Sequence, residues 1–308
     1  MSDFITNIIT ASLRAAVPIL IVALGELYME KSGIINIGLE GFMLIGALTG
    51  SISAHFVNSA GLGIIIAALV CGVFGLIYAF LVVTIKVNQI VTGIAVNLLS
   101  LGLSATIYRG FSRGMTSPSN IAFFENISIP LLSKIPILGQ SVFTQTILVY
   151  LALMLVPFTQ YFLHKTSVGL KLRAAGESAL ATDSAGVNVF RIRYGAIIVG
   201  TMLCGVGGAY LSLVLLRVFV EDMVAGRGFM ALAAVIFGKW SPWGILGAAL
   251  FFGFSDALAI RLQVTGGILP YQVFLTLPYI FTVVVLAGFA GKGKVSSPTE
   301  LGIPYSQE

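Results

Sequence analysis

Long apolar stretches without a single charged residue constrain this chain more than any other feature. Uncharged runs cover residues 56–85, 87–108, 135–163, 194–216 and 262–291. A helix that crosses the hydrocarbon core of a bilayer needs about 20 mostly apolar residues. Only 9% of the 308 residues are charged, against about 25% in an ordinary soluble domain. We therefore expect an integral, multi-pass protein of the cell membrane.

The apolar runs predict an all-α, polytopic helical bundle with about eight to ten transmembrane helices, in a single transmembrane domain over 1–308. The runs lack the short alternating segments of a transmembrane β-barrel. Gly and Pro residues interrupt several of them, so at least one helix is expected to be broken. The predicted spans are 5–28, 34–56, 62–84, 88–109, 142–163, 193–216, 225–239, 243–261 and 270–290.

Basic residues predict which ends of the spans face the cytoplasm. The loop 164–193 carries five Lys and Arg residues, and the C-terminal tail opens with Lys292 and Lys294. Cytoplasmic loops of membrane proteins carry an excess of such residues. We therefore expect this loop and the C-terminus to be cytoplasmic. Counting back along the spans places the polar stretch 110–141 and the N-terminus outside, with no helix expected in 110–141.

The cytoplasmic loop is long enough to be more than a connector. Connections between bundle helices usually take two to eight residues. The segment 166–189 mixes apolar and charged residues and predicts a short helix over about 168–184, closed by Gly186. Such a helix lying along the membrane face favours a docking surface. An ordinary amphipathic connector is the alternative.

The most unusual stretch is GIINIGLEGFMLIGALTG at 33–50, which places Asn36 and Glu40 among apolar residues. A charged side chain at the centre of a membrane costs at least about 2.5 to 3.5 kcal/mol on insertion scales. The surrounding glycines allow a broken helix, whose free backbone groups must line a cavity or be buried in protein. The stretch therefore predicts a discontinuous helix beside a translocation path. If the residues between them are helical, Asn36 and Glu40 stack on one face. Alternatively, Glu40 lies at the membrane interface.

Two other polar residues are candidates for the same path. Asn97 lies inside an uncharged span, where it could also form hydrogen bonds between helices. Asp256 lies in a late apolar run and could equally be a carboxylate at a helix end. Arg261 is five residues beyond Asp256, which is poor spacing for a pair on one helix face.

The end of the first span carries further carboxylates. Glu30 and Lys31 predict an ordinary interfacial pair, and Glu26 could lie at the interface or within the span. The spacing of Gly46 and Gly50 permits close helix packing.

Other function classes find little support in the sequence. Residues 288–294 fit the first seven positions of a phosphate-binding P-loop, but Val295 stands where a Ser or Thr is required. His55 and His164 have no Cys or His near them in the sequence, so no metal site and no cofactor are expected. The net charge of +5 is too scattered for nucleic-acid binding.

Three blocks of sequence carry a resemblance to a known family. They are EKSGIINIGLEGFMLIGAL at 30–48, AAGESALATDSAGVNV at 174–189 and GRGFMALAAVIFGKWSPWG at 226–244. They resemble the permeases of ABC importers for branched-chain amino acids, ribose and nucleosides, and the likeness extends from the first span to about residue 290. The Asn-x-Gly-x-Glu-Gly form of the first block is similar to the nucleoside branch. It departs from the GGIDLSVGS of sugar permeases and from the Asn-Phe-Ala-His-Gly of amino-acid permeases.

The resemblance implies a transport subunit rather than an enzyme. Such a permease pairs with a second permease, in the nucleoside branch a non-identical paralogue, and with an ABC ATPase subunit that hydrolyses ATP. An external substrate-binding protein or lipoprotein delivers the solute. In this reading the loop 164–193 couples the permease to the ATPase. Its candidate coupling residues are Arg173, Glu177, Asp183 and Gly186.

Three alternatives remain open from the sequence. One is an ABC permease for simple sugars. A secondary transporter would need coupling carboxylates in several spans, and only Glu40 and Asp256 qualify. A structural membrane subunit would explain the small-residue packing motifs but not Glu40.

Overall fold

The computed structural model describes residues 2–113, 122–128, 138–264, 276 and 297–306. Within them, eleven α-helices and two short strands follow one another, and π-helical turns extend two of the helices. Their bounds are α1 Ser2–Lys31, α2 Leu39–Val57, α3 Ala60–Ala79 with the π-helical turn Phe80–Thr84, α4 Gln89–Ser112, β1 Asn126–Ser128, α5 Leu138–Val142, β2 Thr144–Thr146, α6 Ile147–Lys165, α7 Ser167–Glu177, α8 Ala179–Ser184, α9 Val189–Tyr210 with the π-helical turn Leu211–Leu215, α10 Arg227–Phe237 and α11 Pro242–Val264.

The predicted all-α bundle is confirmed, and seven of its described helices are long and apolar enough to cross a membrane. The span predicted over 225–239 is wrong, because this segment holds only the 11-residue helix α10. A helix of that length is about 16 Å long, roughly half of the hydrocarbon thickness. The span predicted over 270–290 lies outside the described residues, apart from residue 276.

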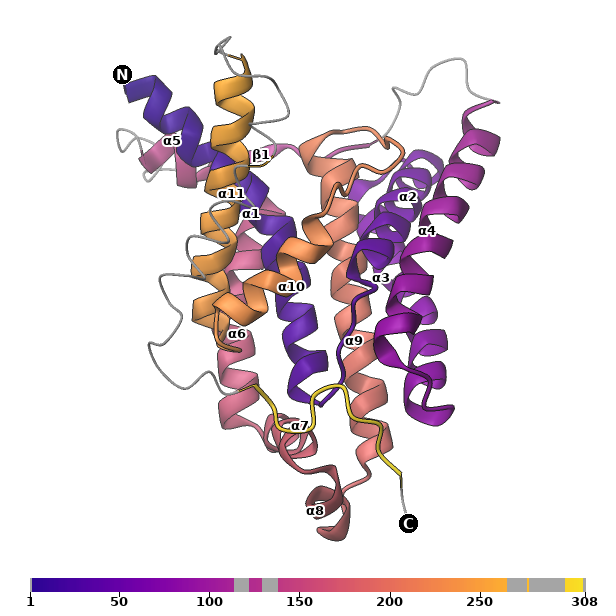
Figure 1. Cartoon of the computed structure of the whole chain (residues 1–308). Coiled ribbons are helices and arrows are strands. Elements are labelled where there is room, and N and C mark those ends of the chain that lie inside the picture. Colours follow the sequence, from indigo (N-terminus) through magenta and orange to yellow (C-terminus); the bar gives the residue numbers. More distant parts are fainter. Residues whose placement is uncertain (1, 114–121, 129–137, 265–275, 277–296, 307–308) are drawn as a thin grey trace.

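The two ends of the bundle carry different connections. Figure 1 shows α7, α8 and residues 297–306 at one end, and the start of α1 with α5 and β1 at the opposite end. Loop 164–193 and the described C-terminal residues therefore share an end, as the basic residues predict. The stretch 110–141, expected to lack helices, contains the short helix α5, and its strand β1 pairs with β2 in antiparallel register.

Side-chain caps explain where several helices begin. The first N–H groups of a helix have no partner within it, and a Ser, Thr or Asn side chain just before the helix can accept them. The residues that do so for α3, α4, α7, α8 and α9 are Ser59, Asn88, Thr166, Ser178 and Asn188.

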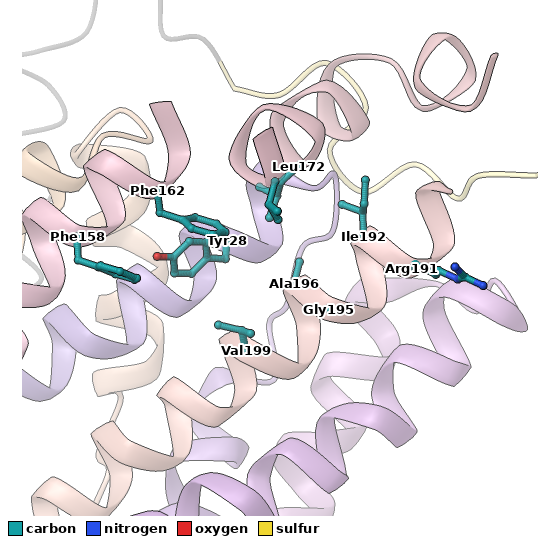
Figure 2. Close-up of a pocket in the computed structure, with 10 residues that line it drawn as sticks. Tyr28, Phe158, Phe162, Leu172, Arg191, Ile192, Gly195, Ala196 and Val199 are labelled. Atoms are coloured by element: carbon teal, nitrogen blue, oxygen red, sulfur yellow. The ribbon is translucent and has the colours of Figure 1, made fainter. Parts of the chain in front are cut away.

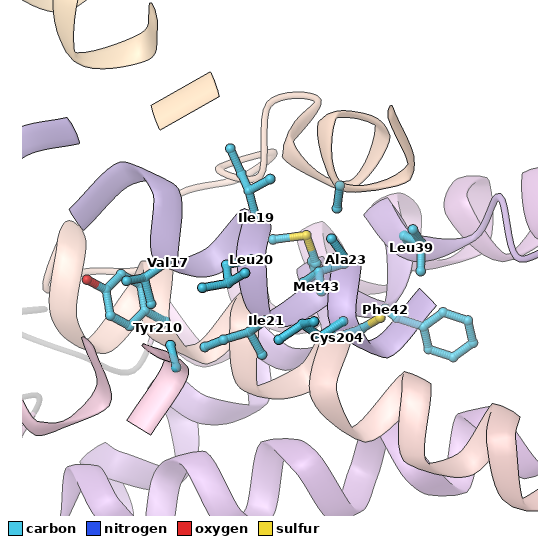
Figure 3. Close-up of a cluster of buried hydrophobic side chains, with 14 of the residues drawn as sticks. Val17, Ile19, Leu20, Ile21, Ala23, Leu39, Phe42, Met43, Cys204 and Tyr210 are labelled. Atoms are coloured by element: carbon cyan, nitrogen blue, oxygen red, sulfur yellow. The ribbon is translucent and has the colours of Figure 1, made fainter. Parts of the chain in front are cut away.

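Small residues let the central helices approach one another closely. A Cβ atom at Gly46 of α2 would overlap the backbone of Gly205 in α9, and one at Gly208 would overlap the backbone of Met43. Backbone contact of this kind is typical of helix pairs in membranes. Buried apolar side chains of α1, α2 and α9 form one cluster, in which Figure 3 shows Ile21, Met43 and Cys204. The predicted close packing through Gly46 is thus confirmed, and it fixes α2 against α9.

Candidate functional site

Residues 32–38 leave the helical path between α1 and α2, where the sequence predicts a break. Side chains from three helices satisfy the backbone of this segment. The Ile35 N–H donates to Gln89 Oε1 at 2.8 Å, and the Tyr78 hydroxyl donates to the Ile35 carbonyl at 2.9 Å. The Asn36 N–H donates to Glu26 Oε1 at 3.0 Å. The backbone of this non-helical segment, called the break below, is therefore held by protein side chains.

Two amide side chains hold the start of α2. Asn36 is fully buried, and its Oδ1 accepts the Gly38 N–H at 2.9 Å. Asn97 reaches across from α4: its Oδ1 accepts the Gly41 N–H at 2.7 Å, and its Nδ2 donates to the Ile37 carbonyl at 2.9 Å. Both side chains thus replace the partners that a continuous helix would supply. Asn97 also forms the contact between helices that the sequence left as its alternative role.

Glu40 lies where the starts of two helices meet. Its Oε1 and Oε2 accept the N–H groups of Gly226 and Gly228, each at 2.7 Å, so the Glu40 carboxylate caps α10 from α2. A carboxylate is favourable at a helix N-terminus, which carries the positive end of the helix dipole. A Cβ at Gly228 would lie 2.6 Å from the Glu40 Cα, so only glycine fits there.

The condition for stacking Asn36 and Glu40 on one helix face is not met. Residues 36–38 are not helical, and α2 begins only at Leu39. Asn36 points into the protein, whereas Glu40 is partly exposed. Asp256 of α11 pairs with Arg227 of α10 at 2.9 Å, a partner that helix spacing alone could not identify. Asp256 thus joins the same junction through α10.

Two further carboxylates belong to this region. The sequence treated Glu30 and Lys31 as an interfacial pair, but Glu30 is buried and accepts a hydrogen bond from the Trp240 indole N–H. Glu26 is also fully buried, and its Oε2 has no hydrogen-bond partner among the described residues. The signal that could have identified them is their four-residue spacing, which stacks both carboxylates on one face of an apolar helix.

The segment proposed for docking forms two helices instead of one. Ser178 separates α7 from α8 with an extended backbone, φ −156°, and its side chain caps α8. Gly186 follows α8 with φ +79°, in the left-handed conformation expected of a closing glycine. Glu177 and Asp183 form hydrogen bonds with Thr299 and Tyr305 of the C-terminal segment.

The outward side of α7 and α8 also carries exposed apolar side chains. Leu170 and Leu180 expose 60% and 64% of their surface. Arg173, the remaining charged coupling candidate, lies in α7, and its side chain is only partly exposed.

An apolar cavity of about 410 Å³ lies between α1, α6, α7 and α9. Figure 2 shows Tyr28, Phe158, Phe162 and Leu172 around it, with Arg191 at one edge. Its lining residues include neither the break nor the start of α10. The cavity therefore lies apart from the polar junction at Glu40, and its surface does not suit a polar solute.

Comparison with known proteins identifies the family. The family described as "Branched-chain amino acid transport system / permease component" matches residues 8–286. The guanosine ABC transporter permease NupQ of Bacillus subtilis is 36% identical over 98% of this chain and 97% of its own length. The nucleoside ABC transporter permease NupC of Lactococcus lactis is 34% identical over 97% of this chain and 96% of its own.

A third relative carries a different substrate name. TsgC13 of Haloferax volcanii, named as a candidate glucose ABC transporter permease, is 33% identical over 92% of each chain. No solved structure matches the chain. From the family match and these nearly full-length similarities, the chain belongs to the ABC transporter permeases of the branched-chain amino acid transport family.

Proposed function

We propose that this permease carries nucleosides into the cell as one subunit of an ABC importer. The observation that carries the proposal is the similarity, over nearly the whole chain, to permeases named for guanosine and for nucleosides. The Asn-x-Gly-x-Glu-Gly block at 36–41 points to the same branch. Its amide and carboxylate groups suit a solute that carries hydroxyl and amide groups.

The proposed path passes the junction of α2 and α10 on its exposed side. Glu40 and Asn97 are partly exposed there, while their polar atoms are already engaged by backbone groups. They would therefore shape the path and contact the solute weakly. A weak site favours transport, because a tightly held solute leaves slowly. Asn36 and Asp256 would support the path indirectly. Asn36 holds the start of α2, and Asp256 holds Arg227 of α10.

The complete pathway would need three other kinds of subunit. A second permease, most simply a non-identical paralogue, would cover the side of the junction that this chain leaves open. An ABC ATPase would dock on the cytoplasmic side against α7 and α8. An external binding protein would deliver the nucleoside at the end that carries β1 and α5.

The glucose relative supplies the one competing substrate class. Family membership excludes the alternatives of a secondary transporter and a structural subunit. TsgC13, however, is nearly as similar to this chain as the nucleoside permeases are. A sugar permease would also accommodate hydroxyl groups at this junction. A nucleoside permease and a sugar permease are distinguished by the solute that the cells take up.

Uptake in whole cells separates nucleosides from glucose. Cells with and without this chain would receive radiolabelled guanosine or radiolabelled glucose at low external concentration. Loss of the chain should abolish high-affinity guanosine uptake, restoring the gene should restore it, and glucose uptake should stay unchanged. The reverse pattern, with glucose uptake lost and guanosine uptake intact, would establish the sugar permease instead.

A further inference from the structure

The C-terminal residues 297–306 fold back onto α7 and onto the non-helical segment 32–38. The Glu300 N–H donates to the Gly176 carbonyl at the end of α7, at 2.9 Å. The Gly302 N–H donates to the Gly33 carbonyl in the break, at 3.0 Å. Figure 1 shows this segment running alongside α7 below the end of α1. Residues 297–306 thus form backbone hydrogen bonds both with the end of α7 and with the non-helical segment 32–38.

A buried arginine joins the same parts from α9. Arg193 exposes only 2% of its surface. Its Nε donates to the Ser32 carbonyl at 3.2 Å, and its Nη1 donates to the Ile303 carbonyl at 3.1 Å. Its Nη2 lies 3.6 Å from Glu300 Oε2. One guanidinium therefore ties α9 to the break and to the C-terminal segment.

Side chains fasten the segment to α7 and α8 as well. The Thr299 hydroxyl donates to Glu177 Oε2 at 2.8 Å. The Tyr305 hydroxyl bonds to Asp183 of α8, and its ring lies 5.6 Å from the ring of Phe190 in α9. The same segment thus holds α7, α8 and α9 together.

Glycines bring the backbones at this junction into direct contact. A Cβ at Gly176 would overlap the Lys31 carbonyl. Gly33 has φ +90°, and a Cβ there would lie 2.9 Å from Arg193 Nη2. The end of α7 therefore rests on the end of α1 with no flexible side chain between them.

We propose that residues 297–306 form a strap, with Arg193 as its positioning residue, that makes α7, α8 and the foot of the break move as one body. The inference rests on the proposed function, because it assigns the strap to the coupling between ATPase and path. Closure of the ATPases would displace α7 and α8. The strap and Arg193 would pass that displacement to residues 32–38 and so to Asn36 and Glu40.

The test measures guanosine transported per ATP hydrolysed by the reconstituted complex with its ATPase and binding protein. Arg193→Gln removes the ion pair and part of the bonding, and this ratio should fall about tenfold, within the range of typical coupling free energies. Arg193→Lys keeps the charge and should lose less. Arg191→Gln is the matched control, since Arg191 is exposed two positions earlier. An unchanged ratio in Arg193→Gln would overturn the strap.

Milder variants keep the test informative if Arg193→Gln fails to accumulate. Tyr305→Phe removes only the bond to Asp183 and should lower the ratio, whereas Ser306→Ala, at an exposed neighbour, should not. Equal ratios in both variants and the parent would contradict the proposal. If the parent complex itself shows no guanosine uptake, the proposed function fails and not the strap.

A reversible cross-link tests whether residues 297–306 stay attached to α7 during transport, as a strap does, or must detach from it. Glu177→Cys combined with Thr299→Cys places thiols at both ends of an observed hydrogen bond, and the native Cys71 and Cys204 are buried. The double variant should show a lowered ratio, and a short bis-methanethiosulfonate, which forms a disulfide with each thiol and releases methanesulfinate, should restore it. If bridging instead stops uptake and reductant releases it, the segment must detach during transport and the strap is wrong.

Discussion

At the scale of single residues, Glu40 makes the contact that distinguishes this structure from an ordinary helical bundle. Both of its carboxylate oxygens accept N–H groups from the start of α10, although Glu40 itself belongs to α2. These N–H groups are partly buried, and an unpaired buried donor costs about 1–3 kcal/mol. The start of α10 is therefore held in part by a side chain from another helix.

Replacement of Glu40 tests this dependence. Glu40→Gln keeps one acceptor oxygen but turns an amide nitrogen towards the second N–H group. Glu40→Leu leaves both groups unpaired and should lower guanosine uptake at least about tenfold, since the loss of two partners costs a few kcal/mol. Glu40→Gln should be milder. The measurement is initial uptake rate at equal membrane levels.

The exposed Glu125 offers a matched control for the loss of a carboxylate. Glu125→Gln should transport like the parent. If Glu40→Leu also does, Glu40 is dispensable and the proposed path is wrong.

The sequence indicates Asn36 and Glu40 because a polar group in an apolar stretch is costly wherever it lies. It could not indicate their partners. Glu40 bonds to residues almost 190 positions away, and Glu30 meets Trp240. These pairs depend on how α10 folds back, which no local pattern records. The four-residue spacing of Glu26 and Glu30 could indicate that they share a helix face, but not that Trp240 is the partner of Glu30.

At the scale of helices, the apolar composition of the sequence showed where the helices lie more accurately than where each helix begins and ends. The segment 225–239 has the apolar character of a span, yet α10 ends at Phe237. Lys239 and Trp240 then turn the chain with φ near +52°. Non-glycine residues rarely adopt this conformation, so their identities give no warning of the turn. The kink at Ser178 escaped prediction similarly, because a serine inside a helix and a serine cap look alike in sequence.

Helix packing through glycine gives a prediction for stability. A Cβ at Gly208 would overlap the Met43 carbonyl, so Gly208→Ala should push α9 away from α2 and destabilise the protein by about 1–3 kcal/mol. Gly195→Ala is the control on the same helix, since nothing lies within 4 Å of a Cβ there. Thermal unfolding in detergent should show a lower Tm for Gly208→Ala only. Equal Tm values would refute the close packing of α2 on α9.

The exposed leucines of α7 and α8 give a prediction for docking. Leu170 and Leu180 lie outward while Glu177 and Asp183 are engaged by the C-terminal segment. Leu170→Asp with Leu180→Asp should therefore reduce co-purification of the ATPase severalfold. Ile127→Asp, an exposed position of β1 at the opposite end, should not. Undiminished ATPase recovery in the double variant would place the docking surface elsewhere.

At the scale of the whole molecule, we expect the chain to form one side of a pathway. Of its seven described candidate spans, α2, α3, α6 and α11 pack on α1 or α9, and α4 packs on α2. Glu40 is partly exposed at the start of α2. A second permease on that side would enclose the solute. We expect the native mass of the purified complex to correspond to one copy of this chain with one non-identical permease. A transporting complex with two copies of this chain and no other permease would contradict the heteromeric assembly.

Transport by the purified complex tests the central claim most directly. Proteoliposomes would contain both permeases and the ATPase, with ATP supplied on the ATPase side and the binding protein with labelled guanosine on the other. The account predicts guanosine accumulation that requires ATP hydrolysis, that unlabelled nucleosides inhibit and that glucose does not. Accumulation of glucose in place of guanosine, or guanosine entry that needs no ATP, would contradict it.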